Sequence, residues 1–123
     1  MTRVLVIDDD AALLRLMRHA LLRAGVAAAV DTAEDGAAGL TLFRTRRPDL
    51  VITDLKMPGT DGFDTLRAIR AAEPAAKVIA IAGHYRESAA FLQRARALGA
   101  SDVLGKPFTP GELTAKAAGC LRL

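Results

Sequence analysis

Short apolar runs alternate with segments of helical periodicity along the whole chain. The apolar runs predict strands at residues 3–7, 27–31, 49–53, 77–81 and 101–104. Apolar residues at three- and four-residue spacing predict a first helix through Leu14, Met17 and Leu21, and further helices over 35–46, 62–72, 86–98 and 110–121. This alternation is typical of a parallel sheet with helices on both faces. We therefore predict a single α/β domain over residues 1–123, a doubly wound (βα)5 fold.

Several predicted helix ends carry residues with a preferred backbone role. Thr109-Pro110-Gly111-Glu112 has the pattern of a capping box with Pro at the first helical position. Gly25 and Gly99 follow helical segments and suit the left-handed conformation that often ends a helix. Asp10 is suited to cap the first helix.

Composition places the chain among ordinary globular proteins, with 51% hydrophobic and 25% charged residues. Lys and Arg number 17 against 14 acidic residues, which gives a net charge of +3. The arginines are spread over several segments, whereas binding to phosphate backbones needs a clustered basic patch. We therefore expect solvated helix faces and no direct contact between this domain and nucleic acid.

The cysteine count and the lengths of the apolar segments indicate in which cellular compartment the protein resides. Cys120 is the only cysteine, so no intramolecular disulfide can form and a reducing environment is indicated. The N-terminus has no signal-peptide pattern, and the longest apolar stretches fall far short of the roughly 20 residues of a membrane span. These observations predict a cytoplasmic protein without a membrane segment.

Charged residues stand at the ends of three predicted strands. Asp8-Asp9-Asp10 follows the first strand, Asp54 ends the third and Lys106 follows the last. Ligands of open α/β sheets bind outside the carboxyl ends of the strands. Carboxylates crowded at that edge repel one another unless a cation is present, and an all-oxygen set of ligands favours Mg²⁺. The sequence therefore predicts a Mg²⁺ site in which Lys106 neutralises an anion bound beside Asp54.

Two prolines lie in the loops around this predicted site. Pro107 restricts Lys106 to extended geometry, and a cis bond between them would aim the ammonium over the sheet edge, although the sequence leaves the isomer open. Pro58-Gly59 fits the central positions of a type II turn. Such a turn would bring a backbone carbonyl back toward the metal.

Three motifs together resemble those of one protein family. They are V-L-V-I-D-D-D at 4–10, V-I-T-D-L-K-M-P-G-T-D-G at 51–62 and G-K-P-F at 105–108. In this combination the chain resembles the receiver domain of a two-component response regulator over essentially its whole length. The resemblance implies a flavodoxin-like sheet with strand order 2-1-3-4-5. It also implies a phosphorelay in which a sensor histidine kinase or a histidine phosphotransfer protein donates a phosphoryl group from a phosphohistidine.

The same resemblance implies a role for each residue of the predicted site. Asp54 would be the phosphoacceptor. Asp9, Asp54 and the backbone carbonyl of Lys56 would bind Mg²⁺ directly, and Asp8 would assist through water. Lys106 would pair with the phosphoryl oxygens.

The chain departs from the family at two positions that normally report phosphorylation. Ala82 replaces the Thr or Ser whose hydroxyl bonds the phosphoryl group, and Val103 replaces the Tyr or Phe that rotates with it. Gly83 still offers a backbone N–H to the phosphate. Lys56 and His84 occupy positions that influence how readily water attacks the phosphoaspartate in receivers. We therefore expect phosphorylation with a muted or different conformational response.

Two other functions compete with that of a phosphoacceptor. Ala82 and Val103 would suit a pseudo-receiver that docks without phosphorylation, although the complete acidic site disfavours it. Asp8-x-Asp10 after an apolar strand also occurs in haloacid-dehalogenase-like phosphatases, but no second acid pair follows Asp54. We therefore expect no enzymatic activity. The resemblance further suggests that a homodimer forms through the 86–121 face.

Overall fold

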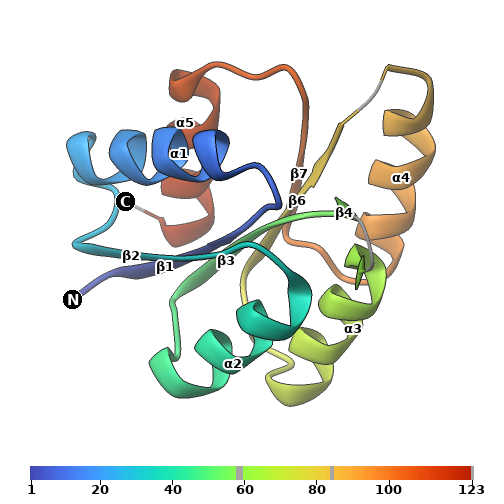
Figure 1. Ribbon diagram of the computed structural model, residues 1–123, viewed down its shortest axis with the longest axis horizontal. Helices are drawn as coiled ribbons and strands as arrows, with labels where there is room; N and C mark the ends of the chain where they lie inside the picture. Colours follow the sequence, from blue (N-terminus) through green and yellow to red (C-terminus); the bar gives the residue numbers. More distant parts are fainter. Residues whose placement is uncertain (58–59, 84, 123) are drawn as a thin grey trace.

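In the computed structural model, which describes residues 1–57, 60–83 and 85–122, five parallel strands form one sheet (Figure 1). The strands are β1 (Arg3–Ile7), β2 (Ala29–Ala33), β3 (Leu50–Asp54), β6 (Val78–Ala82) and β7 (Asp102–Gly105). Their order is β2-β1-β3-β6-β7, so the predicted flavodoxin-like order 2-1-3-4-5 is confirmed. The second strand starts at Ala29 rather than at residue 27. The N–H groups of residues 26 and 27 donate to the Leu21 carbonyl instead of joining the sheet.

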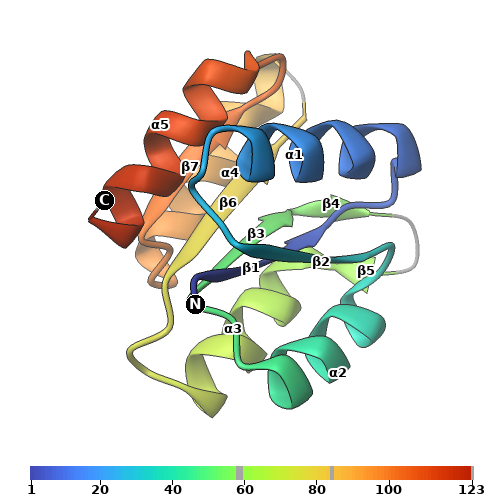
Figure 2. The ribbon, with the colours of Figure 1, turned by 90° about the vertical axis from the view of Figure 1, so that its left-hand side faces the viewer.

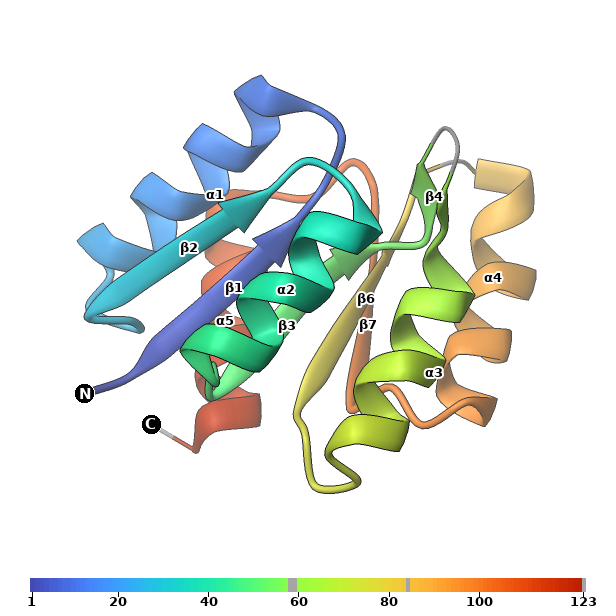
Figure 3. The ribbon, with the colours of Figure 1, turned by 60° about the horizontal axis from the view of Figure 1, so that its bottom comes forward.

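Helices cover both faces of this sheet. They are α1 (Ala11–Arg23), α2 (Gly36–Arg46), α3 (Gly62–Ala72), α4 (Tyr85–Ala97) and α5 (Pro110–Leu121). Helices α1 and α5 lie on one face and α2, α3 and α4 lie on the other (Figures 2 and 3). Within the described ranges, no helix has the length and apolar character that crossing a membrane requires.

The predicted helix ends have the expected local structure. Thr109 and Glu112 form the complete capping box, with the Thr109 hydroxyl accepting from the Glu112 N–H at 3.0 Å. Gly25 and Gly99 follow α1 and α4 with φ of +72° and +99°, a region that glycine enters without steric cost. These local signals are strong enough to be read from the sequence alone.

The core consists of two layers because alternate residues of a strand face opposite sides of the sheet. Val4 and Val6 of β1 pack with Met17 and Leu113 under α1 and α5. The layer under α2, α3 and α4 includes Leu5, Ile7, Phe43, Leu66, Ile69 and Ala95. Burial on both faces explains why the strands read as continuous apolar runs rather than as alternating patterns.

A short hairpin that the sequence did not predict follows β3. Strands β4 (Lys56–Met57) and β5 (Thr60–Asp61) pair in antiparallel fashion, and the type II turn predicted at 58–59 lies outside the described residues. At its end, the Gly62 N–H donates to the Leu55 carbonyl at 3.2 Å. A Cβ at Gly62 would come within 2.6 Å of the Leu55 carbonyl carbon. Only glycine therefore allows α3 to begin in this position.

Replacing Gly62 by alanine is expected to lower the free energy of unfolding by about 2–3 kcal/mol, because the added methyl group meets backbone that cannot rotate away. Gly119→Ala in α5 is the matched control. A Cβ there meets nothing within 4 Å, so this change should stabilise the helix by about 0.5–1 kcal/mol. Urea unfolding of the three proteins measures both effects. Equal stability of Gly62→Ala and the wild type would contradict the steric argument.

One edge of the sheet is partly covered by α1. The Asp8 N–H donates to the Ala33 carbonyl, so the backbone groups at this position of β2 face β1. The backbone groups of Val30, three residues earlier, point outward because the two directions alternate along a strand. The Arg18 Nε of α1 donates to the Val30 carbonyl at 3.4 Å. Arg18 therefore contacts the open edge of the sheet.

Candidate functional site at the carboxyl ends of the strands

Acidic side chains from two neighbouring strands meet at one edge of the sheet. Asp8 follows β1 and Asp54 ends β3, and these strands are paired through Ile7 and Thr53. Asp8 is completely buried and Asp54 is 3% exposed, whereas Asp9 is exposed. One carboxylate oxygen from each of these acids lies within 4.8 Å of the others. The fold thus brings together the three acids that the sequence singled out.

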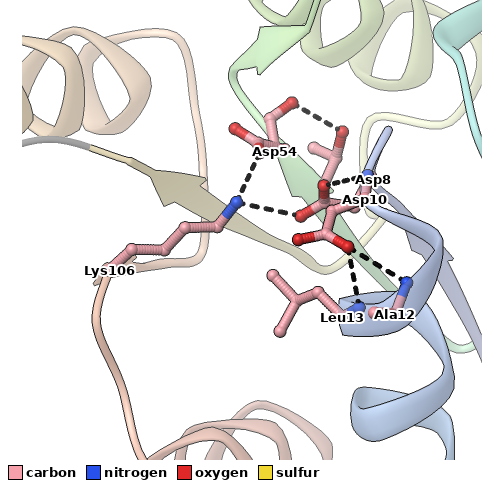
Figure 4. A network of polar contacts seen from close by, with 7 residues as sticks. Asp8, Asp10, Ala12, Leu13, Asp54 and Lys106 are labelled. Atoms are coloured by element: carbon pink, nitrogen blue, oxygen red, sulfur yellow. Dashed lines mark hydrogen bonds and ion pairs between the residues drawn. The ribbon is translucent and has the colours of Figure 1, made fainter.

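Lys106 joins this cluster from the loop after β7. Its Nζ donates to Asp54 Oδ2 at 2.8 Å and to Asp8 Oδ2 at 3.1 Å (Figure 4). The backbone N–H of Lys106 donates to the Ala82 carbonyl at 2.8 Å, and the Lys106–Pro107 bond is cis. One ammonium therefore bridges carboxylates from two strands.

The electrostatics of the cluster follow from burial and from these contacts. Burial, aided by the charge of Asp54, raises the pKa of Asp8 to about 6, although the Asp10 N–H and Lys106 act in the opposite direction. Burial alone would lower the pKa of Lys106, but its hydrogen bond to Asp54 and the charges of Asp54 and Asp8 raise it above its usual value. Lys106 therefore remains cationic at neutral pH. A single ammonium leaves the three carboxylates with excess negative charge, so the cluster is suited to hold a cation.

Asp10 is not a member of the acidic cluster, but it fixes the backbone beside it. Its Oδ1 accepts from the N–H groups of Ala12 and Leu13 at 3.0 and 3.1 Å and so caps α1 (Figure 4). Its own N–H donates to Asp8 Oδ1 at 2.9 Å. Because α1 is fixed in this way, Asp8 keeps one oxygen bound to the backbone and turns the other toward Lys106.

Thr53 is a residue of the site that the sequence reasoning missed. It is completely buried at the end of β3, and its hydroxyl donates to the Asp54 carbonyl at 3.2 Å. A buried hydroxyl needs a partner, and this one is the peptide that carries Asp54. The signal in the sequence was the polar residue at the end of the apolar run L-V-I-T-D.

The two positions that depart from the family pattern are both buried and apolar. Ala82 is 2% exposed at the end of β6, opposite Gly105, and Val103 is 8% exposed in β7, opposite Ala80. Neither side chain offers a hydrogen bond. A Cβ added at Gly83 would meet nothing within 4 Å, so the backbone beside Ala82 borders open space.

Two further predicted residues are described only in part or not at all. The backbone of Lys56 lies in β4, opposite Asp61, and its side chain lies outside the described part of the chain. His84 lies outside the described residues. The predicted influence of these two side chains on hydrolysis stays a prediction.

Similarity to known proteins identifies the family. The family model for the response regulator receiver domain matches residues 4–118, which include every acid of the cluster and Lys106. The chain belongs to the response regulator receiver domain family. A response regulator receiver domain protein from Clostridium thermocellum has 32% sequence identity to this receiver domain and a TM-score of 0.89, over 99% of this chain and 95% of that one.

Longer relatives contain a similar receiver segment. A protein-glutamate methylesterase/protein-glutamine glutaminase of Symbiobacterium thermophilum is 41% identical over 85% of this chain and 29% of its own length. The DNA-binding response regulator MtrA of Mycolicibacterium paratuberculosis is 38% identical over 98% of this chain and 51% of its own length. The receiver domain thus spans about half or less of these curated relatives.

The first of these relatives corrects one prediction. We expected no enzyme because the chain carries no second acid pair, yet this similar protein bears the name of an enzyme. The expectation of no enzymatic activity was therefore wrong. The lack of a hydrolytic residue set in a receiver domain carries no information about activity in the rest of a longer protein, of which the receiver is a minor part.

Proposed function

We propose that this receiver domain accepts a phosphoryl group on Asp54 from a phosphohistidine of a sensor histidine kinase or a histidine phosphotransfer protein. The observation that carries the proposal is the bridge from Lys106 Nζ to Asp54 Oδ2 and Asp8 Oδ2, within a cluster that also includes Asp9. A nucleophilic carboxylate, a cation beside it and further acids for a metal are the parts that phosphoryl transfer to an aspartate needs.

The donor set of the cluster fits Mg²⁺. All available side-chain ligands are carboxylate oxygens, and the buried, raised-pKa Asp8 is a group whose ionised form a nearby cation would favour. We propose that Asp9, Asp54 and the backbone carbonyl of Lys56 hold the ion and that Asp8 assists through water. When bound, Mg²⁺ supplies positive charge that offsets the phosphoryl oxygens.

The chain's own residues account for the transfer. An Asp54 carboxylate oxygen forms a bond to phosphorus while the bond between phosphorus and the donor imidazole nitrogen breaks. The imidazole keeps that electron pair and takes up a proton, and Asp54 becomes an acyl phosphate. Lys106 holds Asp54 before transfer and pairs with the phosphoryl oxygens afterwards, while the backbone N–H of Gly83 is available to the phosphate. Transfer of this kind depends on positioning and charge neutralisation.

Phosphorylation by a small donor tests this function directly. With acetyl phosphate and Mg²⁺, we expect the intact mass to rise by one phosphoryl group, on the peptide that contains Asp54, and the adduct to be labile to hydroxylamine. Omission of Mg²⁺ should abolish the adduct. A protein that stays unmodified under these conditions, while a kinase-derived donor is equally ineffective, would instead be a docking module that works without phosphorylation.

Because residue 82 has no hydroxyl, binding of a phosphoryl analogue should be measurably weaker than with threonine at this position. Ala82→Thr is expected to tighten binding of beryllofluoride with Mg²⁺ about tenfold, because a hydrogen bond to a charged group contributes about 1.5 kcal/mol. Ala82→Val is the matched control, since valine has the shape of threonine without its hydroxyl. Titration followed by amide NMR gives both affinities. Equal tightening by Thr and Val would show that the methyl groups, not the hydroxyl, are responsible.

The last part of the proposal concerns the proteins that this domain contacts and the compartment in which it acts. We propose one receiver domain over residues 1–123 that passes its state on through protein contacts in the cytoplasm, including self-association through the 86–121 face. MtrA is named a DNA-binding regulator, and in a relative of that kind we assign DNA contact to the segment beyond the receiver. The dispersed arginines of this domain support that assignment.

A further inference from the structure

A chain of backbone and side-chain contacts runs from Asp54 to α4 without passing through β7. We propose that the state of Asp54 reaches α4 through Leu55, Gly62, Phe63 and Arg94. The inference rests on the proposed function, since it concerns how phosphorylation of Asp54 is transmitted. It replaces the hydroxyl-to-aromatic relay for which Ala82 and Val103 have no suitable side chains.

The first step is a tight backbone contact. Leu55 directly follows Asp54, is 3% exposed and precedes the Lys56 carbonyl that we propose as a metal ligand. Its carbonyl accepts from the Gly62 N–H at 3.2 Å, and the space between these residues does not admit even a methyl group. Close-packed backbones transmit displacement because neither side can yield. A shift of the Leu55 peptide must therefore move Gly62, the first residue of α3.

The second step leads from α3 to α4. Phe63 follows Gly62 and is only 2% exposed, within the core layer that also contains Ala95 of α4. The guanidinium carbon of Arg94, in the last turn of α4, lies 4.2 Å from the centroid of the Phe63 ring. A cation over an aromatic face at this distance is an attractive, direction-dependent contact. Helices α3 and α4 lie side by side in Figures 1 and 3, so this contact ties the start of one to the end of the other.

Between the side chains of Ala82 and Val103, both within the described part of the chain, no hydrogen bond can form, because both side chains are hydrocarbon. Val103 is buried at 8% exposure in the same apolar layer, and its side chain has no polar atom that could follow a change at Ala82. Arg96, two residues beyond Arg94, points to a different partner, with Nη2 at 3.4 Å from Asp102 Oδ1. Arg94 and Arg96 therefore allow the two routes to be tested separately on the same helix.

Amide NMR of three proteins tests the inference. In the wild type, beryllofluoride with Mg²⁺ should shift the amides of Leu55 and Gly62 and those around Arg94, but hardly that of Val103. In Arg94→Gln, the shifts at Leu55 and Gly62 should persist, while those of α4 should fall to the level of residues distant from the site. Arg96→Gln should respond like the wild type. Phe63→Leu, which keeps an apolar side chain but lacks the aromatic face, should reproduce the effect of Arg94→Gln.

The possible outcomes separate this inference from the proposed function. If saturating beryllofluoride leaves Leu55 and its neighbours unshifted in the wild type, the proposed phosphoacceptor site fails. If Leu55 and Gly62 shift but α4 does not, or if α4 responds equally in Arg94→Gln and Phe63→Leu, the site stands and the route through Arg94 is overturned. Circular dichroism of each variant verifies that the helices are intact.

Discussion

Asp54→Asn is expected to abolish incorporation of a phosphoryl group from acetyl phosphate or from a kinase. The amide is nearly the same size as the carboxylate, and its oxygen can still accept from Lys106 Nζ, now 2.8 Å from Asp54 Oδ2, so the fold should be preserved. The amide oxygen lacks the negative charge that makes the carboxylate a nucleophile and a metal ligand. The loss should therefore be complete rather than partial, as measured by intact mass after exposure to the donor and Mg²⁺.

Asp102→Asn is the matched control for this result. Asp102 also accepts from a lysine, with Lys116 Nζ at 3.2 Å, but it lies at the start of β7, away from the carboxyl ends of the strands. Its pKa lies below the usual value, because hydrogen bonds from the Val103 N–H and Lys116 outweigh the effect of burial. This variant should be phosphorylated like the wild type. Persistent labelling of Asp54→Asn would place the phosphoacceptor elsewhere.

Lys106→Met is expected to lower the free energy of unfolding by about 2–4 kcal/mol at pH 7 without Mg²⁺. The change leaves the buried Asp8 and Asp54 without their shared cation, and removing one partner of a buried pair typically costs about 3–5 kcal/mol. We expect slightly less because 24% of the Lys106 side chain is exposed to solvent. Urea unfolding in the presence of a chelator measures the difference.

The pH and metal dependence of this variant follow from the signs of the pKa shifts. The folded pKa of Asp8, about 6, exceeds its ordinary 3.8, so ionised Asp8 disfavours the folded state and stability falls as the pH rises from about 4 through 6. Without Lys106, which lowers the pKa of Asp8, that pKa should rise further and the fall should extend to higher pH. The difference between variant and wild type should therefore shrink near pH 4, where Asp8 is protonated in the folded protein. Added Mg²⁺ should reduce the difference at pH 7.

Lys116→Met is the control, because Lys116 pairs with the more exposed Asp102 and its loss should cost less than about 1 kcal/mol. Two observations would contradict the electrostatic account of Lys106. One is a Lys106→Met protein as stable as the wild type at pH 7. The other is a loss of stability that is equal at pH 4 and pH 7, which would indicate lost packing of the lysine stem instead.

Sequence patterns were sufficient to predict those structural features for which a residue type has one dominant role. Apolar runs buried on both faces, the capping box at Thr109 and the glycines after α1 and α4 are of this kind. The acidic cluster was also predictable, because parallel strands end at a common edge and Asp8 and Asp54 follow neighbouring strands.

Other features depend on contacts that no local pattern encodes. Strands of two residues, such as β4 and β5, are too short to show periodicity, so the hairpin could not be recognised. The start of β2 was misplaced because Val26 and Ala27 are apolar and buried like strand residues, yet they bond to the end of α1. The contact of Arg94 with Phe63 joins residues far apart in the sequence, and neither residue is unusual in its own helix.

The contact between Arg18 and the edge of β2 has a consequence for any search for partner-binding residues on α1. On the surface of α1, Leu16 is 50% exposed, so its side chain can be exchanged with little effect on the fold. Arg18 is a poor choice, because its Nε donates to the outward-facing Val30 carbonyl and an uncovered strand edge invites pairing between copies. An Arg18 variant that loses a partner should therefore be checked for self-association before the loss is attributed to recognition.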